Sequence, residues 1–200
     1  MSTYKPLAEK LRPSDLNDFI GQRHLLDSDK PIGKALSDQQ LHSMILWGPS
    51  GVGKTTLARI ICAQMGAHFE QMSAVLDGIK ELRNVIKHAE LYKQNDTSTI
   101  LFVDEIHRFN KAQQDAFLPH IESGLITLIG ATTENPSFEI NSSVLSRARV
   151  YILNKLSNKE LESIAIRAMT DQDVKLENDG SLSLIIDSSD GDARRLINII

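Results

Sequence analysis

One stretch of the chain decides its fold: Trp47-Gly48-Pro49-Ser50-Gly51-Val52-Gly53-Lys54-Thr55-Thr56, which fits the pattern G-x-x-x-x-G-K-[ST] of a phosphate-binding loop. Residues 43–47 form an apolar run of strand length before it, and the spacing of apolar residues after it predicts a helix that starts near Gly53. Gly48 and Gly53 permit backbone angles closed to other residues, so consecutive N–H groups can surround a phosphate at the positive end of the helix dipole.

This loop predicts a site for ATP and Mg²⁺. Lys54 is expected to reach the β- and γ-phosphates, and the Thr55 hydroxyl is expected to ligate Mg²⁺. The nucleotide-binding residues that the loop supplies are Gly48, Pro49, Ser50, Gly51, Val52, Gly53, Lys54, Thr55 and Thr56.

Two carboxylates follow a second apolar run. Residues 100–103 have the length of a buried strand, and Asp104 and Glu105 come directly after them. In a parallel sheet the carboxyl ends of the strands line the ligand crevice. Asp104 is suited to help hold Mg²⁺, and Glu105 is suited to polarise a water molecule for attack on the γ-phosphate.

Apolar runs of strand length alternate with helix patterns from residue 43 to residue 154, which predicts an α/β fold with a mostly parallel sheet covered by helices on both faces. The expected strands are 43–47, 69–72, 100–103, 125–131 and 150–153. A helix is predicted over residues 111–121, with Ala112 among its inward residues and a kink at Pro119.

The segments on either side of this nucleotide-binding core (43–154) have different patterns. Residues 1–42 are polar and interrupted by proline and glycine, so we expect loops and short helices that wrap the sheet. Residues 155–200 show helix patterns only, which predicts a small helical domain. Its last apolar stripe is still running at Ile200 without a stop signal, so we expect this domain to be incomplete and the chain to be a fragment of a longer protein.

Composition indicates a protein outside membranes. The 200 residues are 41% hydrophobic with a formal net charge of −4, but no apolar run approaches the ~18 residues needed to span a bilayer, and no signal-peptide pattern opens the chain. We therefore expect a cytoplasmic protein. The charge does not indicate a nucleic-acid protein, although Arg108 and Lys111 are candidates for DNA contact. Solvated surface charges are at least as good an interpretation of these two residues.

The order of the motifs resembles that of an AAA+ ATPase of the clamp-loader clade: phosphate loop, strand-tip carboxylates, a strand ending in threonines, an arginine pair, and a late Gly-Asp-x-Arg-Arg. Residues 42–49, 102–111 and 130–138 are similar to the bacterial replication-associated recombination protein A family, whose eukaryotic relative is the Werner-helicase-interacting ATPase. The resemblance implies a P-loop AAA+ domain with a five-stranded sheet, followed by a helical lid that this chain truncates.

The same resemblance implies a function. Members of this family would be tetrameric, DNA-dependent ATPases acting at stalled or collapsed replication forks, with a C-terminal oligomerisation region that this chain lacks. Single-stranded or fork-like DNA and single-stranded-DNA-binding protein are the implied partners, and the location is the cytoplasm, in association with the nucleoid. The isolated fragment is expected to be monomeric and weakly active. The alternative function is a nucleotide-gated assembly module that binds ATP without significant hydrolysis.

The resemblance also assigns residues within the subunit. Thr133 matches the polar residue that reports the γ-phosphate, with Asn135 as its nearest rival, and Arg194 matches the lid arginine that reaches the same subunit's γ-phosphate. The backbone that flanks adenine corresponds to Ile20, Gly21 and Gln22.

One arginine is expected to act between subunits. Arg147 matches the arginine that clamp-loader subunits offer to a neighbour's ATP, and Ala148 replaces the cysteine usual in that motif. The departure leaves open whether Arg147 or Arg149 has this role. The predicted catalytic set is thus Glu105, Lys54, Thr133, Arg147 and Arg194.

Overall fold

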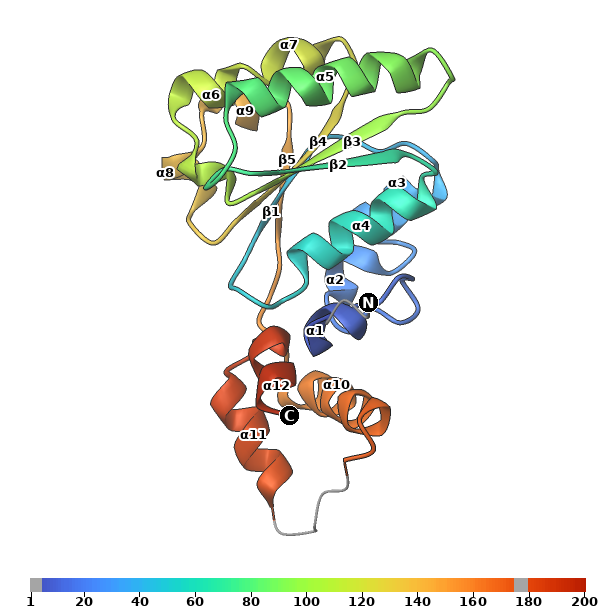
Figure 1. The fold of residues 1–200 in the computed structure, drawn as a ribbon, viewed down its shortest axis with the longest axis vertical. Coiled ribbons are helices and arrows are strands. Elements are labelled where there is room, and N and C mark those ends of the chain that lie inside the picture. The colour runs from blue at the N-terminus through green and yellow to red at the C-terminus, as the bar shows by residue number, and fades with distance from the viewer. Residues whose placement is uncertain (1–4, 175–179) are drawn as a thin grey trace.

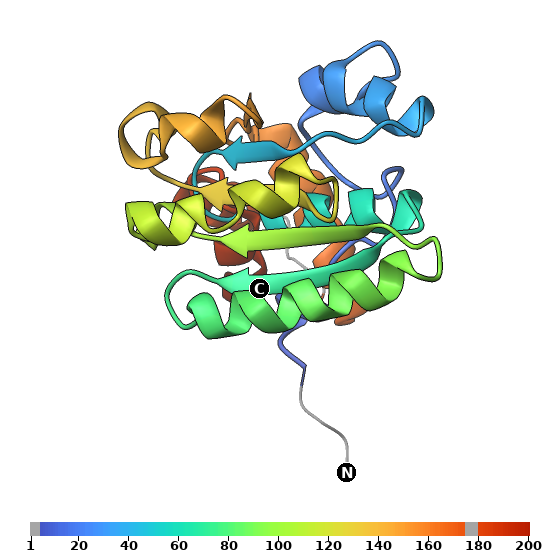
Figure 2. The ribbon, with the colours of Figure 1, turned by 90° about the horizontal axis from the view of Figure 1, so that it is seen from above.

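Five parallel strands form one sheet in the spatial order β2-β3-β4-β1-β5 (Figure 1). The computed structural model describes residues 5–174 and 180–200. Figure 2 shows the strand arrows pointing the same way, so the prediction of a parallel five-stranded sheet between helices is confirmed. The strands are β1 (Met44–Trp47), β2 (His68–Ser73), β3 (Thr99–Asp104), β4 (Thr127–Thr132) and β5 (Arg149–Ile152).

The sheet is buried on both faces because its strands alternate apolar side chains between two separate cores. In β1, Met44 and Leu46 belong to one core and Ile45 to the other. Burial of this kind requires helices above and below the sheet. The first core is covered by α2 (Arg23–Leu26), α3 (Pro31–Ser37) and α4 (Lys54–Gln64), and the second by α5 (Ile79–Lys93), α7 (Leu118–Glu122) and α9 (Ser142–Leu145) (Figure 1).

The single helix predicted over 111–121 is wrong in two respects. The segment forms α6 (Lys111–Asp115) and α7, because Pro119 fits the first turn of a new helix, where no backbone N–H is needed. Ala112 is exposed, whereas Gln114 is buried. The Gln114 amide donates to the carbonyls of Phe109 and Glu139, so its burial leaves no donor without a partner. The remaining short elements of the core are η1 (Ile106–Arg108) and α8 (Pro136–Glu139).

The N-terminal segment and the C-terminal helices meet below the sheet in Figure 1. Three helices, α10 (Asn158–Asp171), α11 (Ser181–Ser189) and α12 (Ala193–Ile199), enclose a small core of their own. We call them the helical unit; the predicted lid range 155–200 also contains residues 175–179, which lie outside the described part. α1 (Leu7–Lys10) contacts α12, and Gln22 exchanges two hydrogen bonds with the backbone of Asn154. Within 5–174 and 180–200, no helix combines the length and apolar character that a bilayer crossing requires.

Asp192 joins the helical unit to the phosphate loop. Its carboxylate accepts hydrogen bonds from Ser50 Oγ at 2.8 Å and from the backbone N–H of Arg195 at 2.9 Å, so it caps α12 and touches the loop at once. The Ala193 N–H donates to the carbonyl of Gly51 at 3.2 Å. A Cβ atom on Gly51 would overlap the Asp192 carboxylate. A glycine at this position therefore permits the helical unit to approach the loop.

We expect Gly51→Ala to loosen α12 from the phosphate loop. The new methyl group meets the Asp192 carboxylate, and the residue has φ +65°. Gly124→Ala is the matched control, because Gly124 has φ +63° with open space around its Cβ position. Hydrogen exchange should speed up in α12 in the first variant only. Equal exchange in the two variants would show that the contact with Asp192 is not what requires glycine.

Candidate nucleotide site

A cavity of about 500 Å³ lies where the phosphate loop, the N-terminal segment and the helical unit meet. Residues 50–56 of the loop form one part of its wall, and Asp104 and Glu105 from the carboxyl end of β3 form another. Arg194 of α12 reaches the same cavity. The cavity therefore brings together the loop, both strand-tip carboxylates and the late arginine.

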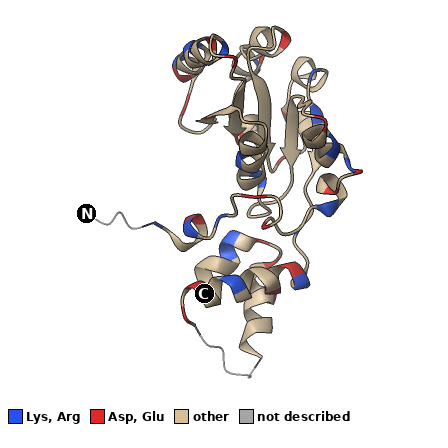
Figure 3. Cartoon of the chain, turned by 90° about the vertical axis from the view of Figure 1, so that its right-hand side faces the viewer, with Lys and Arg blue, Asp and Glu red and all other residues tan. Residues whose placement is uncertain are grey.

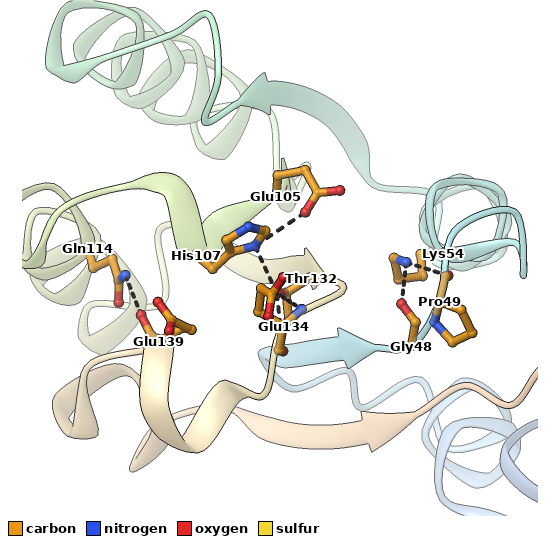
Figure 4. A network of polar contacts seen from close by, with 9 residues as sticks. All are labelled: Gly48, Pro49, Lys54, Glu105, His107, Gln114, Thr132, Glu134 and Glu139. Carbon is orange, nitrogen blue, oxygen red and sulfur yellow. Dashed lines mark hydrogen bonds and ion pairs between the residues drawn. The ribbon is translucent and has the colours of Figure 1, made fainter.

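Lys54 is buried at the first residue of α4, with only 8% of its surface exposed. Its Nζ donates to the carbonyls of Gly48 and Pro49, each at 2.7 Å (Figure 4). Burial lowers the pKa of Lys54 below its ordinary value; the charges of Glu105 and Asp104 oppose that shift, and Arg194 adds to it. A buried cation whose hydrogen bonds go to neutral carbonyls is suited to receive an anion.

The structure explains why glycine occupies two positions of the phosphate loop. A Cβ atom on Gly48 would overlap the carbonyl oxygen of Leu153 in the segment after β5. Gly53 has φ +98° and precedes the first residue of α4, where Thr55 lies in the first turn. The N–H groups of a helix's first turn have no partner within the helix, so they are available to a ligand at its positive end.

Glu105 adopts a backbone conformation that is uncommon for glutamate. Its φ is +52° and ψ is +45°, in the left-handed region, immediately after Asp104 ends β3. Its Oε2 atom is buried and has no hydrogen-bond partner among the described residues. An observed outlier of this kind at a cavity wall is typical of a functional residue.

Two residues connected to Glu105, His107 and Thr132, were not predicted from the sequence. His107 Nδ1 lies 3.2 Å from Glu105 Oε2 and 2.9 Å from Oγ1 of Thr132, the last residue of β4 (Figure 4). Nearness in sequence to Glu105 was the only available signal for His107, and nothing in the pattern indicated its pairing with Thr132.

The predicted γ-phosphate sensors have different surroundings. Thr133 is exposed just beyond β4, and the described residues that line the cavity do not include it. Asn135 uses its side-chain oxygen to accept from the N–H of Ser137 and so caps α8. The structure therefore leaves the choice between Thr133 and Asn135 as a prediction.

Of the three residues expected near adenine, Ile20 lines the cavity. Gly21 has φ +91° and packs against Leu156, and Gln22 is buried with its amide paired to Asn154. These two residues fasten the N-terminal segment to the start of the helical unit.

Arg147 and Arg149 lie at the opposite edge of the sheet from the cavity. Arg149 opens β5 and pairs with Met44 at the start of β1, whereas the phosphate loop follows the other end of β1. Arg147 is exposed; its Nε donates to Glu122 at 2.6 Å and its Nη1 to the carbonyl of Ser143 at 2.9 Å. Neither arginine is placed to serve the cavity of its own chain.

The N-terminal segment contributes more of the cavity wall than the sequence indicated. Residues Pro6 to Pro13 supply several lining side chains, among them Glu9 and Arg12. Arg12 forms an ion pair with Glu9 through Nη2, but its Nε and Nη1 are buried without a partner among the described residues. Prolines in this segment break any periodic pattern, so its role could not be read from apolar spacing.

Comparison with known proteins identifies the family of the chain. Residues 11–146 match the family model described as Holliday junction DNA helicase RuvB P-loop domain. A solved structure of RuvB from Thermotoga maritima, described as the Holliday junction branch migration motor, has a TM-score of 0.76 and 32% identity, covering 94% of this chain and 63% of that one.

The chain is also similar over its whole length to curated proteins with other names. Replication-associated recombination protein A of Escherichia coli K12 is 52% identical over 206 residues, which cover 100% of this chain and 46% of that protein. ATPase WRNIP1 of Dictyostelium discoideum is 45% identical and covers 99% of this chain and 23% of that protein. The chain thus spans about half the length of its bacterial relative. Because the family match covers more than half of the chain and contains the phosphate loop and both carboxylates, the chain belongs to the RuvB-type P-loop AAA+ ATPases, a family with members in replication-associated recombination.

Proposed function

We propose that this chain is the nucleotide-hydrolysing part of a DNA-dependent ATPase of the clamp-loader clade that acts in replication-fork maintenance and recombination. Hydrolysis of ATP to ADP and phosphate would drive remodelling of DNA or of a replication partner. The observation that carries this proposal is the shared cavity of Lys54, Asp104 and Glu105. The printed names of the relatives, which refer to recombination and branch migration, support the biological setting.

The cavity fits a polyphosphate because donor atoms of Arg12 and Lys54 have no carboxylate partner in the described part of the chain, although Arg12 also pairs with Glu9 through Nη2. Two nitrogens of Arg12 are buried without a partner among the described residues, and Lys54 donates only to backbone carbonyls in the hydrogen bonds it forms. A buried donor left unpaired costs about 1–3 kcal/mol, so an acceptor that enters here is stabilised by satisfying it. Phosphate and ribose oxygens or ring nitrogens of ATP are acceptors of the required kind.

The residues then divide the chemistry between them. Thr55 and Asp104 would hold Mg²⁺, which neutralises charge on the phosphate oxygens when bound. Glu105 accepts a proton from the attacking water, while Lys54 and Arg194 stabilise the charge that develops on the phosphate. Thr133, or its rival Asn135, reports the γ-phosphate.

Arg147 acts on a neighbouring subunit in this proposal. It lies at the edge of the sheet away from its own cavity, and its exposed pair with Glu122 is of a kind worth ~0–1 kcal/mol, so assembly releases it at little cost. The homo-oligomer is a tetramer in our proposal, built with residues that extend beyond this chain, and the isolated chain is a weakly active monomer.

DNA, single-stranded or fork-like, is the proposed partner of that assembly, and single-stranded-DNA-binding protein is a further one, in the nucleoid-associated cytoplasm. Figure 3 shows Lys and Arg interspersed with Asp and Glu over the helices of the chain. Arg108 and Lys111 are exposed beyond β3, on the same edge of the sheet as the cavity. A basic surface would thus form by bringing such positions together in an assembly.

The alternative is a nucleotide-gated assembly module that binds ATP without significant hydrolysis. Such a module needs Lys54 but has no use for a strained glutamate beside the γ-phosphate. The backbone conformation of Glu105 and its place on the cavity wall therefore favour hydrolysis.

Lys54→Ala should weaken binding of a fluorescent ATP analogue by about a hundredfold or more, because the phosphates lose a buried charge-assisted partner. Lys87→Ala, on the exposed face of α5, is the matched control and should bind normally. Near-normal affinity of the Lys54 variant would remove the loop from the binding site.

Glu105→Gln should keep ATP binding and lower single-turnover hydrolysis ~10²–10⁴-fold, because an amide cannot accept the water's proton. Glu139→Gln changes an exposed carboxylate on α8 and should leave the rate unchanged. Hydrolysis within a few-fold of the unmodified chain would instead remove Glu105 from the mechanism.

The role of Arg147 can be tested in a fusion of this chain to the C-terminal half of the Escherichia coli relative. Arg147→Ala should lower the fusion's turnover ~10³-fold or more and leave the slow 200-residue chain unaffected. Arg149→Ala in the same fusion decides between the two arginines.

Mixing Arg147→Ala and Lys54→Ala fusions should restore part of the activity, since mixed oligomers contain sites with an intact loop and an intact arginine. An inactive mixture in which mixed oligomers demonstrably form would contradict action between subunits.

A further inference from the structure

His107 connects the carboxylate of Glu105 to the end of the neighbouring strand β4. Its Nδ1 lies 3.2 Å from Glu105 Oε2 and 2.9 Å from Thr132 Oγ1, and its side chain is 12% exposed (Figure 4). The described residues that line the nucleotide cavity do not include His107. It therefore contacts the predicted base from behind and stays out of contact with the ligand.

The hydrogen-bond partners of Thr132 favour His107 as the donor in this contact. Thr132 Oγ1 accepts from the N–H of Glu134 at 3.0 Å, and its own proton is directed to the Glu134 carbonyl at 3.3 Å. Glu105 can act as a base in the proposed reaction only without its own proton, and in that form its carboxylate only accepts hydrogen bonds. Because Nδ1 lies close to oxygen atoms of both Thr132 and Glu105, we assign a proton to Nδ1 of His107; this assignment follows from the network and from no observed hydrogen.

One donor thus lies between two acceptors. The contact with Thr132 has hydrogen-bond geometry, whereas Glu105 Oε2 is buried, close to Nδ1, and without a hydrogen-bond partner among the described residues. A small rotation of the imidazole would move the N–H from Thr132 to Glu105. The end of β4 and Glu105 are thus both within reach of the same N–H.

We propose that His107 is a positioning residue for hydrolysis: its Nδ1–H orients the Glu105 carboxylate and couples that carboxylate to Thr132. This inference rests on the proposed ATPase function. Thr132 immediately precedes Thr133, the predicted reporter of the γ-phosphate, so a displacement of the strand end by bound nucleotide reaches Glu105 through a single imidazole. The sharing of one N–H makes Glu105 respond to the state of β4.

Three substitutions separate this role from simple packing. In asparagine, Nδ2 is bonded to Cγ as Nδ1 is in histidine, so His107→Asn retains a donor at this point, whereas His107→Gln places its amide one bond further out. Single-turnover hydrolysis should fall about tenfold to a hundredfold in His107→Ala and His107→Gln and recover to within about threefold in His107→Asn. The dissociation constant for ATP should stay within about twofold in all three, because His107 does not contact the ligand.

A double-mutant cycle shows whether the effect passes through Glu105. His107→Ala should add less than about twofold to the loss in Glu105→Gln, and Thr132→Val should lower the rate with ATP affinity unchanged. Additive losses, or equal rates in the alanine and asparagine variants, would overturn the inference. Thermal unfolding of each variant identifies any variant that fails to fold. If the other variants fail to fold, His107→Asn alone is compared with the unmodified chain. Its rate should then be close to that of the unmodified chain, and a loss of more than about tenfold would overturn the inference.

A spectroscopic measurement tests the contact without hydrolysis. In chain labelled with ¹⁵N-histidine, long-range ¹H–¹⁵N spectra should show His107 protonated on Nδ1, and Glu105→Gln should shift that resonance. A bare Nδ1 would overturn the inference even if the chain is an active ATPase. If the unmodified chain binds ATP and never hydrolyses it, the proposed function is overturned, and with it this role of His107. If the chain hydrolyses ATP at a rate that does not depend on His107, only the inference is overturned.

Discussion

The structure depends on the burial of β1 between β4 and β5. Both of its edges are paired, and both of its faces are covered, by Met44 and Leu46 on one side and Ile45 on the other. A one-residue slip would exchange the two faces and undo both cores, so the register of this strand is strongly constrained. The glycine loop consequently leaves the sheet at a fixed point, at the same edge as the carboxyl ends of β3 and β4. The positions of Glu105, Thr132 and Lys54 relative to one another follow from that constraint.

The site divides its charges among elements distant in sequence. Cations come from the N-terminal segment, the phosphate loop, α10 and α12, whereas Asp104 and Glu105 come from the end of β3. The lowered pKa of Lys54 shows that nearby carboxylates do not offset the cost of its burial. Lys54 donates to backbone carbonyls and forms no ion pair with the residues that the structure describes, whereas a cation kept for stability alone would be expected to have a carboxylate partner. This arrangement leaves room for a favourable electrostatic contribution from a ligand.

Local patterns predicted the loop, the strands and the carboxylates, because each depends on a short run of residues whose chemistry and period are visible in the sequence. Several contacts that sequence reasoning missed join distant segments: His107 with Thr132, Gln22 with Asn154, and Asp192 with the loop. Gln114 shows the same limitation for burial, since its amide is satisfied by carbonyls that a search for apolar residues cannot anticipate. The arginine and sensor assignments rest on resemblance and remain predictions.

The cavity wall draws on residues from Pro6 to Asn198, nearly the whole length of the chain. During synthesis on the ribosome, the sheet strands emerge well before α12, so the binding site is the last part of this chain to be completed. The N-terminal segment can form its hydrogen bonds with Asn154 only after that residue has been synthesised, and its contact with α12 only after the helical unit has been synthesised. A ligand that binds only the finished cavity stabilises the whole chain by mass action. Cellular nucleotide would thus favour chains that have completed folding over those still incomplete.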